Sequence, residues 1–172
     1  MLAEGKQCLR KQKQELIPDV KGMPGMDAVA LLENLGIKVK AVGNIGESYA
    51  LSVALEKFDF YVIELSSFQL DRMFDFKANI AIILNISPDH LDRYEGDFSK
   101  YSKSKFRINQ NMKTNDHLVY NYDDQVISDW ISSKNKKLHQ FHPVSITKKL
   151  VTGSWIEEDQ INININNKKT TI

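Results

Sequence analysis

Two short apolar runs constrain the fold of this chain more than any other feature. Residues 60–63 read Phe-Tyr-Val-Ile, and residues 80–84 read Ile-Ala-Ile-Ile-Leu. Unbroken apolar runs of this length are typical of strands that are covered on both faces, as in a parallel sheet. The apolar side chains between the runs fit one short helix; they are Phe68, Leu70, Met73 and Phe74. The sequence therefore predicts an α/β fold around a strand, helix, strand unit with a right-handed crossover.

Polar side chains follow both runs, at positions that a buried strand would not choose for stability. Glu64 ends the first run, and Asn85, Asp89 and His90 follow the second. Because both strands of a crossover unit end at the same edge of the sheet, we expect these side chains to converge there, where α/β proteins bind ligands. Two simpler interpretations stay open: Glu64 could be a solvated strand end, and His90 a turn residue bonded to the backbone.

The segments before the first run also alternate between helical and extended patterns. The sequence predicts a helix over 26–35, which stops at Gly36, a half-exposed strand over 37–41 and a helix over 48–57. Residues 43–46, Gly-Asn-Ile-Gly, form a turn in which backbone amides and the Asn44 side chain can approach a ligand closely. Ordinary turns use the same residue types, so this turn alone does not identify a site.

A helix that begins after Asp97 carries the most unusual lysine in the sequence. The apolar residues at steps of three and four are Phe98, Tyr101, Ile108 and Met112. Lys105 falls on the same face. A lysine among core-facing positions can extend to solvent, pair with an acid or take part in chemistry, and the spacing alone favours extension to solvent.

The C-terminal third predicts further strands. Residues 118–120 fit a strand, Asn121-Tyr-Asp-Asp a turn or helix cap before a helix over 126–131, and residues 138–141 another strand. Residues 154–156 and 161–165 fit an antiparallel hairpin in which Ile161, Ile163 and Ile165 face inward. Lys168 to Ile172 resembles the start of one more strand, so we expect an incomplete domain.

The composition excludes several classes of partner. The 23 basic and 22 acidic residues leave a formal charge of +1, which gives no reason to expect nucleic acid or an acidic membrane surface. No apolar stretch approaches the roughly 18 residues needed to span a bilayer, and the N-terminus lacks the apolar core of a signal peptide. The single cysteine, Cys8, cannot form an internal disulfide. We therefore expect a cytoplasmic protein.

The polar residues at the predicted sheet edge suit phosphoryl transfer. Mg²⁺ prefers oxygen ligands and often shares them with phosphates, and Glu64 could supply one such oxygen. The neutral imidazole of His90 could bind metal or steady a phosphate. Lys105, if deprotonated, could react with carbon dioxide to form a carbamate, which would provide another oxygen ligand. Positioning and charge neutralisation supply most of the catalysis in such sites.

Three stretches together resemble the central ATPase domain of the Mur ligase family. They are Glu64-Leu-Ser-Ser-Phe-Gln-Leu, Leu84-Asn-Ile-Ser-Pro-Asp-His-Leu-Asp-Arg-Tyr and Tyr101-Ser-Lys-Ser-Lys105. The motif Ser-Ser-Phe-Gln-Leu resembles that of the D-glutamate-adding members of the family. The resemblance covers roughly residues 43–172. It implies a parallel-sheet central domain, here truncated, with a C-terminal antiparallel β portion.

The resemblance also implies roles for individual residues. Asn44 and Ser66 would contact the UDP-muramoyl substrate, as would His90. Glu64 would hold the Mg²⁺ that bridges the phosphates of ATP, and His90 with a carbamylated Lys105 would hold a second Mg²⁺. The implied reaction uses ATP to activate the carboxylate of UDP-N-acetylmuramoyl-L-alanine, and the amine of D-glutamate then displaces phosphate to form an amide.

The chain departs from the family pattern in one important way. The family places a Gly-x-x-Gly-Lys-Thr/Ser phosphate loop before the Gly-Asn-Ile-Gly turn, and no such sequence occurs here. The flanking domains that bind UDP and the incoming amino acid are also expected to be missing. We therefore expect ATP binding to be impaired and the chain to be inactive by itself.

The N-terminal residues suggest a second, different origin. Residues 1–15 fit a polar tail, and residues 16–42 resemble part of a PASTA module, with a β-α-β order. The predicted division is therefore 1–15, 16–42 and 43–172. The alternative interpretation of 16–42 is an ordinary strand, helix and strand of the main domain. The PASTA resemblance implies an alternative function, a peptidoglycan-binding module, and a folded remnant without a ligand is a third possibility.

Overall fold

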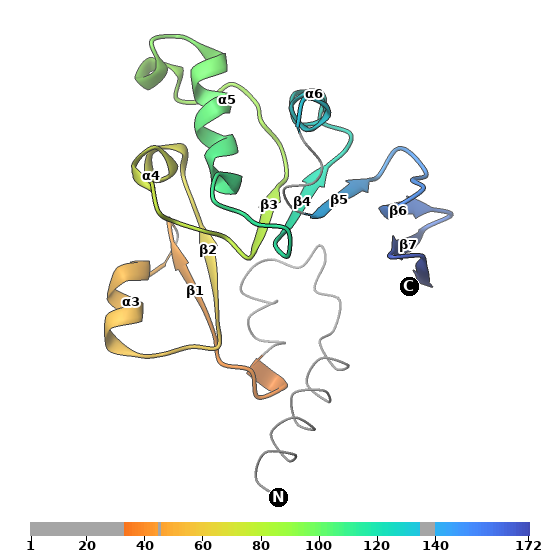
Figure 1. Ribbon diagram of the computed structural model, residues 1–172, viewed down its shortest axis with the longest axis horizontal. Helices are drawn as coiled ribbons and strands as arrows, with labels where there is room; N and C mark the ends of the chain where they lie inside the picture. Colours follow the sequence, from red (N-terminus) through yellow and green to blue (C-terminus); the bar gives the residue numbers. More distant parts are fainter. Residues whose placement is uncertain (1–32, 45, 135–139) are drawn as a thin grey trace, which may run out of the picture. The chain divides into compact units, whose positions relative to one another are not determined.

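The computed structural model describes residues 33–44, 46–134 and 140–172 (Figure 1). Its contacts divide the chain into two compact units, residues 1–66 and residues 67–172, and each is described here by itself. Among the described residues, each unit contains one sheet. None of the described helices is both long and apolar enough to cross a bilayer.

The first unit contains a two-stranded parallel sheet. Strand β1 (Val39–Gly43) pairs with β2 (Phe60–Glu64) in a register that sets Gly43 opposite Glu64. Helix α3 (Tyr49–Leu55) connects the two strands. Ile37 and Val39 form a small buried core with Leu35 and Ala41 packed against it. The strand predicted over 37–41 is therefore present, but it begins and ends two residues later than predicted. Residues 26–32 of the predicted upstream helix lie outside the described residues.

Helix α3 lies where the sequence predicts a helix but buries an unexpected face. Ser52 is its buried residue, whereas Leu51, Val53 and Leu55 are exposed. The apolar content of the segment therefore identified a helix without identifying the side that packs within this unit.

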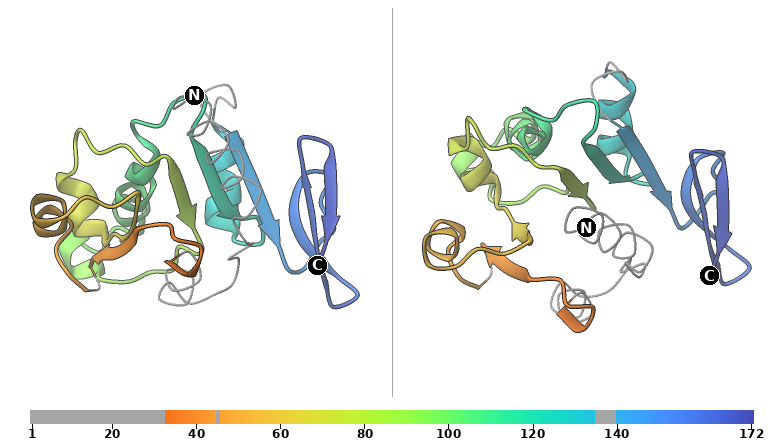
Figure 2. Two further views of the ribbon diagram at one scale, coloured as in Figure 1. Left: turned by 90° about the horizontal axis from the view of Figure 1, so that it is seen from below. Right: turned by 60° about the horizontal axis from the view of Figure 1, so that its bottom comes forward.

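The second unit contains a six-stranded sheet in sequence order (Figure 2). The first four strands are parallel; they are β3 (Ile80–Ile83), β4 (His117–Asn121), β5 (Gln140–Ser145) and β6 (Gly153–Glu157). Strands β7 (Gln160–Ile165) and β8 (Lys168–Thr171) continue the sheet in antiparallel fashion. The predicted α/β class and its C-terminal antiparallel portion are both confirmed.

Five helical segments connect or flank these strands. They are α4 (Ser67–Arg72), the 3₁₀ helix η1 (Leu91–Tyr94), α5 (Phe98–Phe106), the 3₁₀ helix η2 (Arg107–Asn109) and α6 (Gln125–Ser132). Asp97 caps α5, as predicted, because its carboxylate accepts hydrogen bonds from the amides of Ser99 and Lys100. The predicted helical face is shorter than expected, since α5 ends before Ile108 and Met112.

The core of the second unit forms between β3, β4 and the helices. Leu118 on β4 and Ile127 on α6 have no exposed surface and pack with Ala81 and Ile83 of β3. The rings of Phe106 and Trp130 stack with centroids 4.0 Å apart and add an aromatic contact between α5 and α6. This core fixes the carboxyl ends of β3 and β4, from which the candidate site residues extend.

Strands β2 and β3 differ from the prediction in two respects. They belong to separate sheets among the described residues, because β2 pairs with β1 and β3 pairs with β4. Neither strand is covered on both faces. Alternate side chains remain exposed on each; they are Phe60 and Val62 on β2 and Ile80 and Ile82 on β3. An unbroken apolar run thus identified the strands, but it did not show which neighbours cover them.

The C-terminal hairpin also differs from the prediction in which side chains it buries. Asn164 is buried, and its Nδ2 donates a 2.6 Å hydrogen bond to the carbonyl of Val151, whereas Ile161, Ile163 and Ile165 are only half-buried. The predicted strand is therefore present, but its burial does not follow the predicted alternation, because Asn162 is half-buried like the three isoleucines and Asn164 is the buried side chain. Gly153 has φ +105°, and a Cβ there would lie 2.1 Å from the carbonyl oxygen of Pro143. Glycine is required at this point because β5 passes so close.

Neighbouring isoleucines on β3 provide a direct test of which face is packed. Ile83 is 7% exposed and Ile82 is 56% exposed. We predict that Ile83→Ala lowers the free energy of unfolding by about 2–5 kcal/mol, since it removes buried methyl groups and leaves a cavity. Ile82→Ala, the matched control, should cost less than about 1 kcal/mol. Urea denaturation of both variants measures the difference, and equal losses would contradict the one-sided packing of β3.

Candidate functional site

Asn44 and Glu64 meet at the carboxyl ends of β1 and β2. The backbone amide of Asn44 donates to the carbonyl of Glu64 at 2.8 Å, and its side-chain Nδ2 lies 3.3 Å from Glu64 Oε1. Gly43 makes this approach possible, because its φ is +115° and a Cβ would lie 2.3 Å from the Glu64 carbonyl oxygen. The parallel register thus places an amide and an exposed carboxylate side by side. Ser66, two residues beyond Glu64, is half-buried in the same unit.

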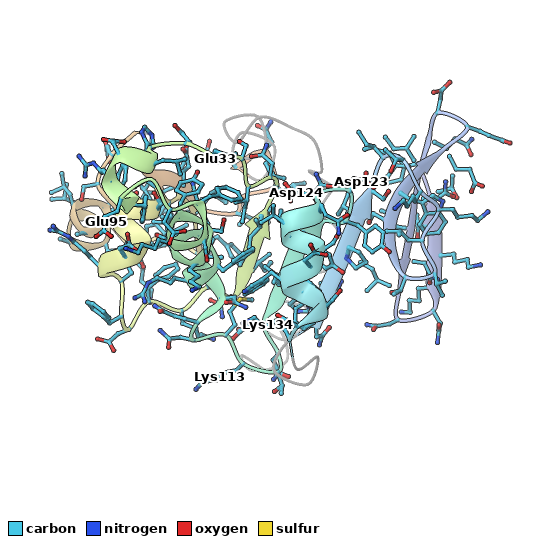
Figure 3. All side chains as sticks on the ribbon, turned by 90° about the horizontal axis from the view of Figure 1, so that it is seen from above. Glu33, Glu95, Lys113, Asp123, Asp124 and Lys134 are labelled. Atoms are coloured by element: carbon cyan, nitrogen blue, oxygen red, sulfur yellow. The ribbon has the colours of Figure 1, made fainter. Side chains whose placement is uncertain are left out.

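The loop after β3 is anchored to the next helix by Asp124. One carboxylate oxygen of Asp124 accepts the amide of Ile86 at 2.9 Å, and the other accepts the amide of Ile127 at 3.0 Å in the first turn of α6. Figure 3 shows Asp123 and Asp124 at the N-terminal end of this helix. A single side chain therefore caps α6 and fixes the start of the loop that carries Asn85, Asp89 and His90.

His90 is presented to solvent from a constrained backbone. Its φ is +48°, and its side chain is 58% exposed. Asp89 accepts the backbone amide of His90 at 2.8 Å, and its second oxygen lies 3.4 Å from His90 Nε2. The ring of Phe68, on α4, lies 5.3 Å from the imidazole. The left-handed conformation, which a non-glycine residue rarely adopts, turns the histidine away from the core.

Tyr94 joins three segments of the second unit around this histidine. Its hydroxyl donates to Asp71 on α4 at 2.9 Å and lies 3.2 Å from Ser104 Oγ on α5. Ser104 in turn donates to the carbonyl of Ser67 at 2.8 Å. These bonds connect α4, η1 and α5 through buried hydroxyl groups. The Tyr94 ring also stacks near Phe68, which contacts His90, and packs edge-on against Tyr101.

Lys105 extends along the outer side of this aromatic cluster. It is half-buried, and its Nζ lies 5.7 Å from the centre of the Tyr101 ring. Among the described residues no carboxylate pairs with it. Burial raises the pKa of the Tyr101 phenol, and the charge of Asp89 adds to that shift. Of the three roles left open for Lys105, pairing with an acid is therefore not observed here.

The predicted residues form two groups, one in each unit. Asn44 and Glu64 are in direct contact in the first unit, whereas His90 and Lys105 are linked in the second through the intervening rings of Phe68, Tyr94 and Tyr101. Sequence reasoning identified Asp124 only as part of a turn or cap, and it missed Tyr94 and Ser104 as positioning residues. The sequence offered one signal for Tyr94, which is its position next to the loop that carries His90.

The donor set suits a metal that is shared with a ligand. No group of three or more histidine, cysteine, aspartate or glutamate side chains that could hold a metal occurs within the described ranges. Glu64 offers an exposed carboxylate, and the side-chain Nδ2 of Asn44 approaches it to 3.3 Å. Mg²⁺ is often bound by one or two carboxylates together with phosphate oxygens and water, and a lone carboxylate fits that arrangement.

Asp123 fixes the loop after β5 in a similar way to Asp124. Its carboxylate accepts the hydroxyls of Ser145 and Thr147, each at 2.7 Å, and the amide of Ile146 at 2.8 Å. Partial burial opposes ionisation of Asp123, but the hydrogen bonds from these hydroxyls and amides outweigh it and hold the pKa of the carboxyl below its ordinary value. Adjacent aspartates therefore anchor the loops that follow β3 and β5.

Comparison with known proteins identifies a family and several relatives. The family model described as the Mur ligase middle domain matches residues 28–172. A protein of Christiangramia forsetii named UDP-N-acetylmuramoylalanine--D-glutamate ligase is 49% identical over 83% of this chain and 32% of its own length. A protein of the same name from Bacteroides thetaiotaomicron is 41% identical over 77% of this chain and 30% of its own length. The chain thus spans about a third of these relatives.

A solved structure supports the fold. A chain described as MurF ligase from Thermotoga maritima in complex with ADP matches with a TM-score of 0.55 and 18% identity. The match covers 84% of this chain and 35% of the other. At this identity the likeness supports the fold alone.

The family model begins at residue 28, within the segment 16–42 that is predicted to resemble a PASTA module. Residues 16–32 of that segment lie outside the described part of the chain. The predicted division at residue 42 therefore stays a prediction.

The lowered pKa of Asp123 predicts a specific acid sensitivity. Because the folded-state pKa lies below the unfolded value of about 3.9, the carboxylate stabilises the fold above that pH, and this stabilisation is lost as the pH falls toward the folded-state pKa. We predict that Asp123→Asn flattens the loss of stability below about pH 4, relative to the unchanged chain. Denaturant unfolding at several pH values measures it. An unchanged acid slope would contradict this role, and Asp159→Asn, in an exposed turn, is the control.

Proposed function

Because this chain belongs to the Mur ligase family, we propose that it forms part of the catalytic core of an ATP-dependent ligase in peptidoglycan precursor synthesis. The proposed reaction joins D-glutamate to UDP-N-acetylmuramoyl-L-alanine in the cytoplasm. The observation that carries this proposal is the shared name of relatives that are 41–49% identical over at least three-quarters of the chain. The contact between Asn44 and Glu64 in the first unit supports it, as does the exposed His90 in the second unit.

Asn44 and Ser66 are proposed to contact the UDP-muramoyl substrate. The Asn44 side chain is held against Glu64 through Nδ2, and its carbonyl oxygen accepts no hydrogen bond from the described residues. A primary amide fixed at one end can offer its other end to a ligand without a large loss of side-chain entropy. Asn44 directly follows the end of β1, and Ser66 lies two residues beyond the end of β2. Ligands of α/β folds bind at such strand ends.

Glu64 is proposed to hold one Mg²⁺, and His90 with a carbamylated Lys105 a second. When bound, the two ions would neutralise phosphate charge during phosphoryl transfer. The carbamate would form when the deprotonated Nζ of Lys105 attacks the carbon of carbon dioxide and releases a proton. Among the described residues no carboxylate forms an ion pair with Lys105, so its Nζ is not committed to a salt bridge that the carbamate would have to break.

The reaction then requires two displacement steps. An oxygen of the substrate carboxylate attacks the γ-phosphorus of ATP, and ADP leaves with the electrons of the broken P–O bond. The amine of D-glutamate attacks the carbon of the resulting acyl phosphate, phosphate leaves, and the amine nitrogen loses a proton. His90 is proposed to steady the acyl phosphate. Its exposed ring on a fixed backbone suits a positioning role, because catalysis of this kind depends on alignment.

We further propose that the isolated chain does not complete this reaction. It spans about a third of its relatives, and the phosphate-loop sequence expected for ATP is not among its residues. Binding of the UDP-muramoyl substrate and turnover are therefore separate questions, and each has its own test.

We predict that UDP-N-acetylmuramoyl-L-alanine raises the melting temperature of the chain in the presence of magnesium. A ligand at 100 times its Kd stabilises the bound state by about 2.7 kcal/mol, which corresponds to roughly 5–10 °C for a chain of this size. Asn44→Ala should abolish most of the shift, and Glu64→Gln its magnesium dependence. Glu158→Gln, in an exposed turn, is the matched control. No shift at saturating ligand, measured by scanning fluorimetry, would argue against the proposed substrate.

We predict no phosphate release above background when the purified chain is mixed with ATP, magnesium, D-glutamate and UDP-N-acetylmuramoyl-L-alanine. The physical reason is that positioning of the ATP phosphates, which supplies much of the rate, needs a phosphate-binding loop. A relative of full length serves as the positive control in the same assay. Release that requires D-glutamate and disappears in His90→Ala would show that the chain is active by itself.

A further inference from the structure

A hollow of about 670 Å³ lies against α4 and η1 in the second unit, beside the segment that carries His90. Side chains from both helices line it; they include Phe68, Asp71, Arg72, Met73, Arg93 and Tyr94. Its volume lies in the range of small-molecule sites, well above that of a single phosphate or carboxylate. We propose that this hollow binds an oxyanion carried by a larger organic molecule, with Arg72 and Arg93 as the groups that bind the charge.

The two guanidinium groups are free to bind a ligand. Within the described part of the chain, the side chain of neither Arg72 nor Arg93 forms a hydrogen bond or an ion pair with another residue. The acid in the same wall is already engaged, because Asp71 accepts the 2.9 Å hydrogen bond from the Tyr94 hydroxyl. The lining therefore has an excess of positive charge, and the donors of both arginines remain unused.

A third arginine nearby shows how the fold uses such a side chain for structure. Arg107 donates from Nε to the carbonyl of Leu70 at 2.8 Å and from Nη2 toward that of Met73. Gln110 also donates to the Met73 carbonyl. The backbone acceptors at the C-terminal end of α4 are thus satisfied from the side of η2. Arg72 and Arg93 have no comparable structural task, which is consistent with a role in binding.

Arg93 is held in an orientation that suits a planar anion. Its guanidinium carbon lies 4.3 Å from the centre of the Phe68 ring, which also contacts His90 on the preceding turn. Contact with an aromatic ring restricts the guanidinium and leaves its N–H edge to donate. A carboxylate or phosphate matches this edge with two parallel hydrogen bonds. Phe68 and Met73 provide apolar surface for the rest of the ligand.

The source of the anion rests on the proposed function, whereas the existence of the site does not. UDP-N-acetylmuramoyl-L-alanine carries both phosphates and a carboxylate, so either could occupy the hollow. Uridine 5′-monophosphate and N-acetyl-L-alanine separate the two sources, because each carries one of these anions on an organic group. Inorganic phosphate and acetate are the corresponding anions without apolar surface.

The test is a titration followed by NMR signals of the amides over 68–73 and 93–94 and of the arginine Nε–H groups. We expect saturable shifts at these positions with phosphate or acetate, and tighter binding of the matching organic anion. Arg93→Gln and Arg72→Gln should each weaken binding on the order of tenfold, equivalent to about 1.4 kcal/mol. Lys169→Gln removes one positive charge from exposed β8 and should leave the affinity unchanged.

Two outcomes would overturn the proposal of an anion site. Shifts that do not saturate, or that weaken equally in Lys169→Gln, would indicate general attraction of anions to positive charge. Organic anions that bind no more tightly than phosphate and acetate would remove the role of the apolar wall. Unchanged signals outside the hollow show that each variant is folded. If the substrate fails to raise the melting temperature while these shifts persist, the proposed function fails and the anion site remains.

Discussion

The carboxylate of Asp124 is the interaction on which the arrangement of the second unit's site most depends. It accepts one amide from the loop after β3 and one from the first turn of α6, so a single charged group holds together two segments that are far apart in the sequence. Hydrogen bonds to a charged acceptor are stronger than those between neutral groups. Without it, Ile86 would carry a buried, unpaired amide, and the backbone leading to His90 would lose its anchor.

Asp123 extends the same principle to the next loop. Its hydrogen bonds to Ser145, Ile146 and Thr147 hold the chain after β5, while Asp124 holds the chain after β3. Strand β4, which lies between β3 and β5, is thus followed by two acids that organise the loops on both sides. The carboxyl edge of this sheet is ordered mainly by side chains that take no direct part in the proposed chemistry.

The sequence predicted most elements of the fold because their local signals were strong. The runs over 60–63 and 80–84, the cap at Asp97 and the antiparallel hairpin at the C-terminus were all found where expected. Burial was predicted less well. An apolar run shows that a segment can be covered but not which neighbours cover it, so the exposed Leu51 on α3 and the buried Asn164 on β7 could not be foreseen.

The candidate site shows the same limit. The motifs identified Asn44, Glu64, His90 and Lys105, and the contact of the first two follows from the parallel register of β1 and β2. The hydroxyl network of Tyr94, Ser104 and Ser67 was not predictable, because its partners are 10 and 37 residues apart and serine and tyrosine occur at many positions without such bonds. Residue types indicate possible chemistry, whereas their mutual support depends on tertiary packing.

The exposed apolar faces of β2 and β3 bear on the proposal that the isolated chain does not complete the ligase reaction. Each strand has one hydrogen-bonded neighbour among the described residues, and each leaves alternate apolar side chains in solvent. Natural sheets usually protect such edges with charged residues, proline or covering segments, and β3 has neither charge nor proline within it. The site residues follow directly at the ends of these same strands. A segment that covered either face would therefore lie next to Glu64 or to the loop carrying His90.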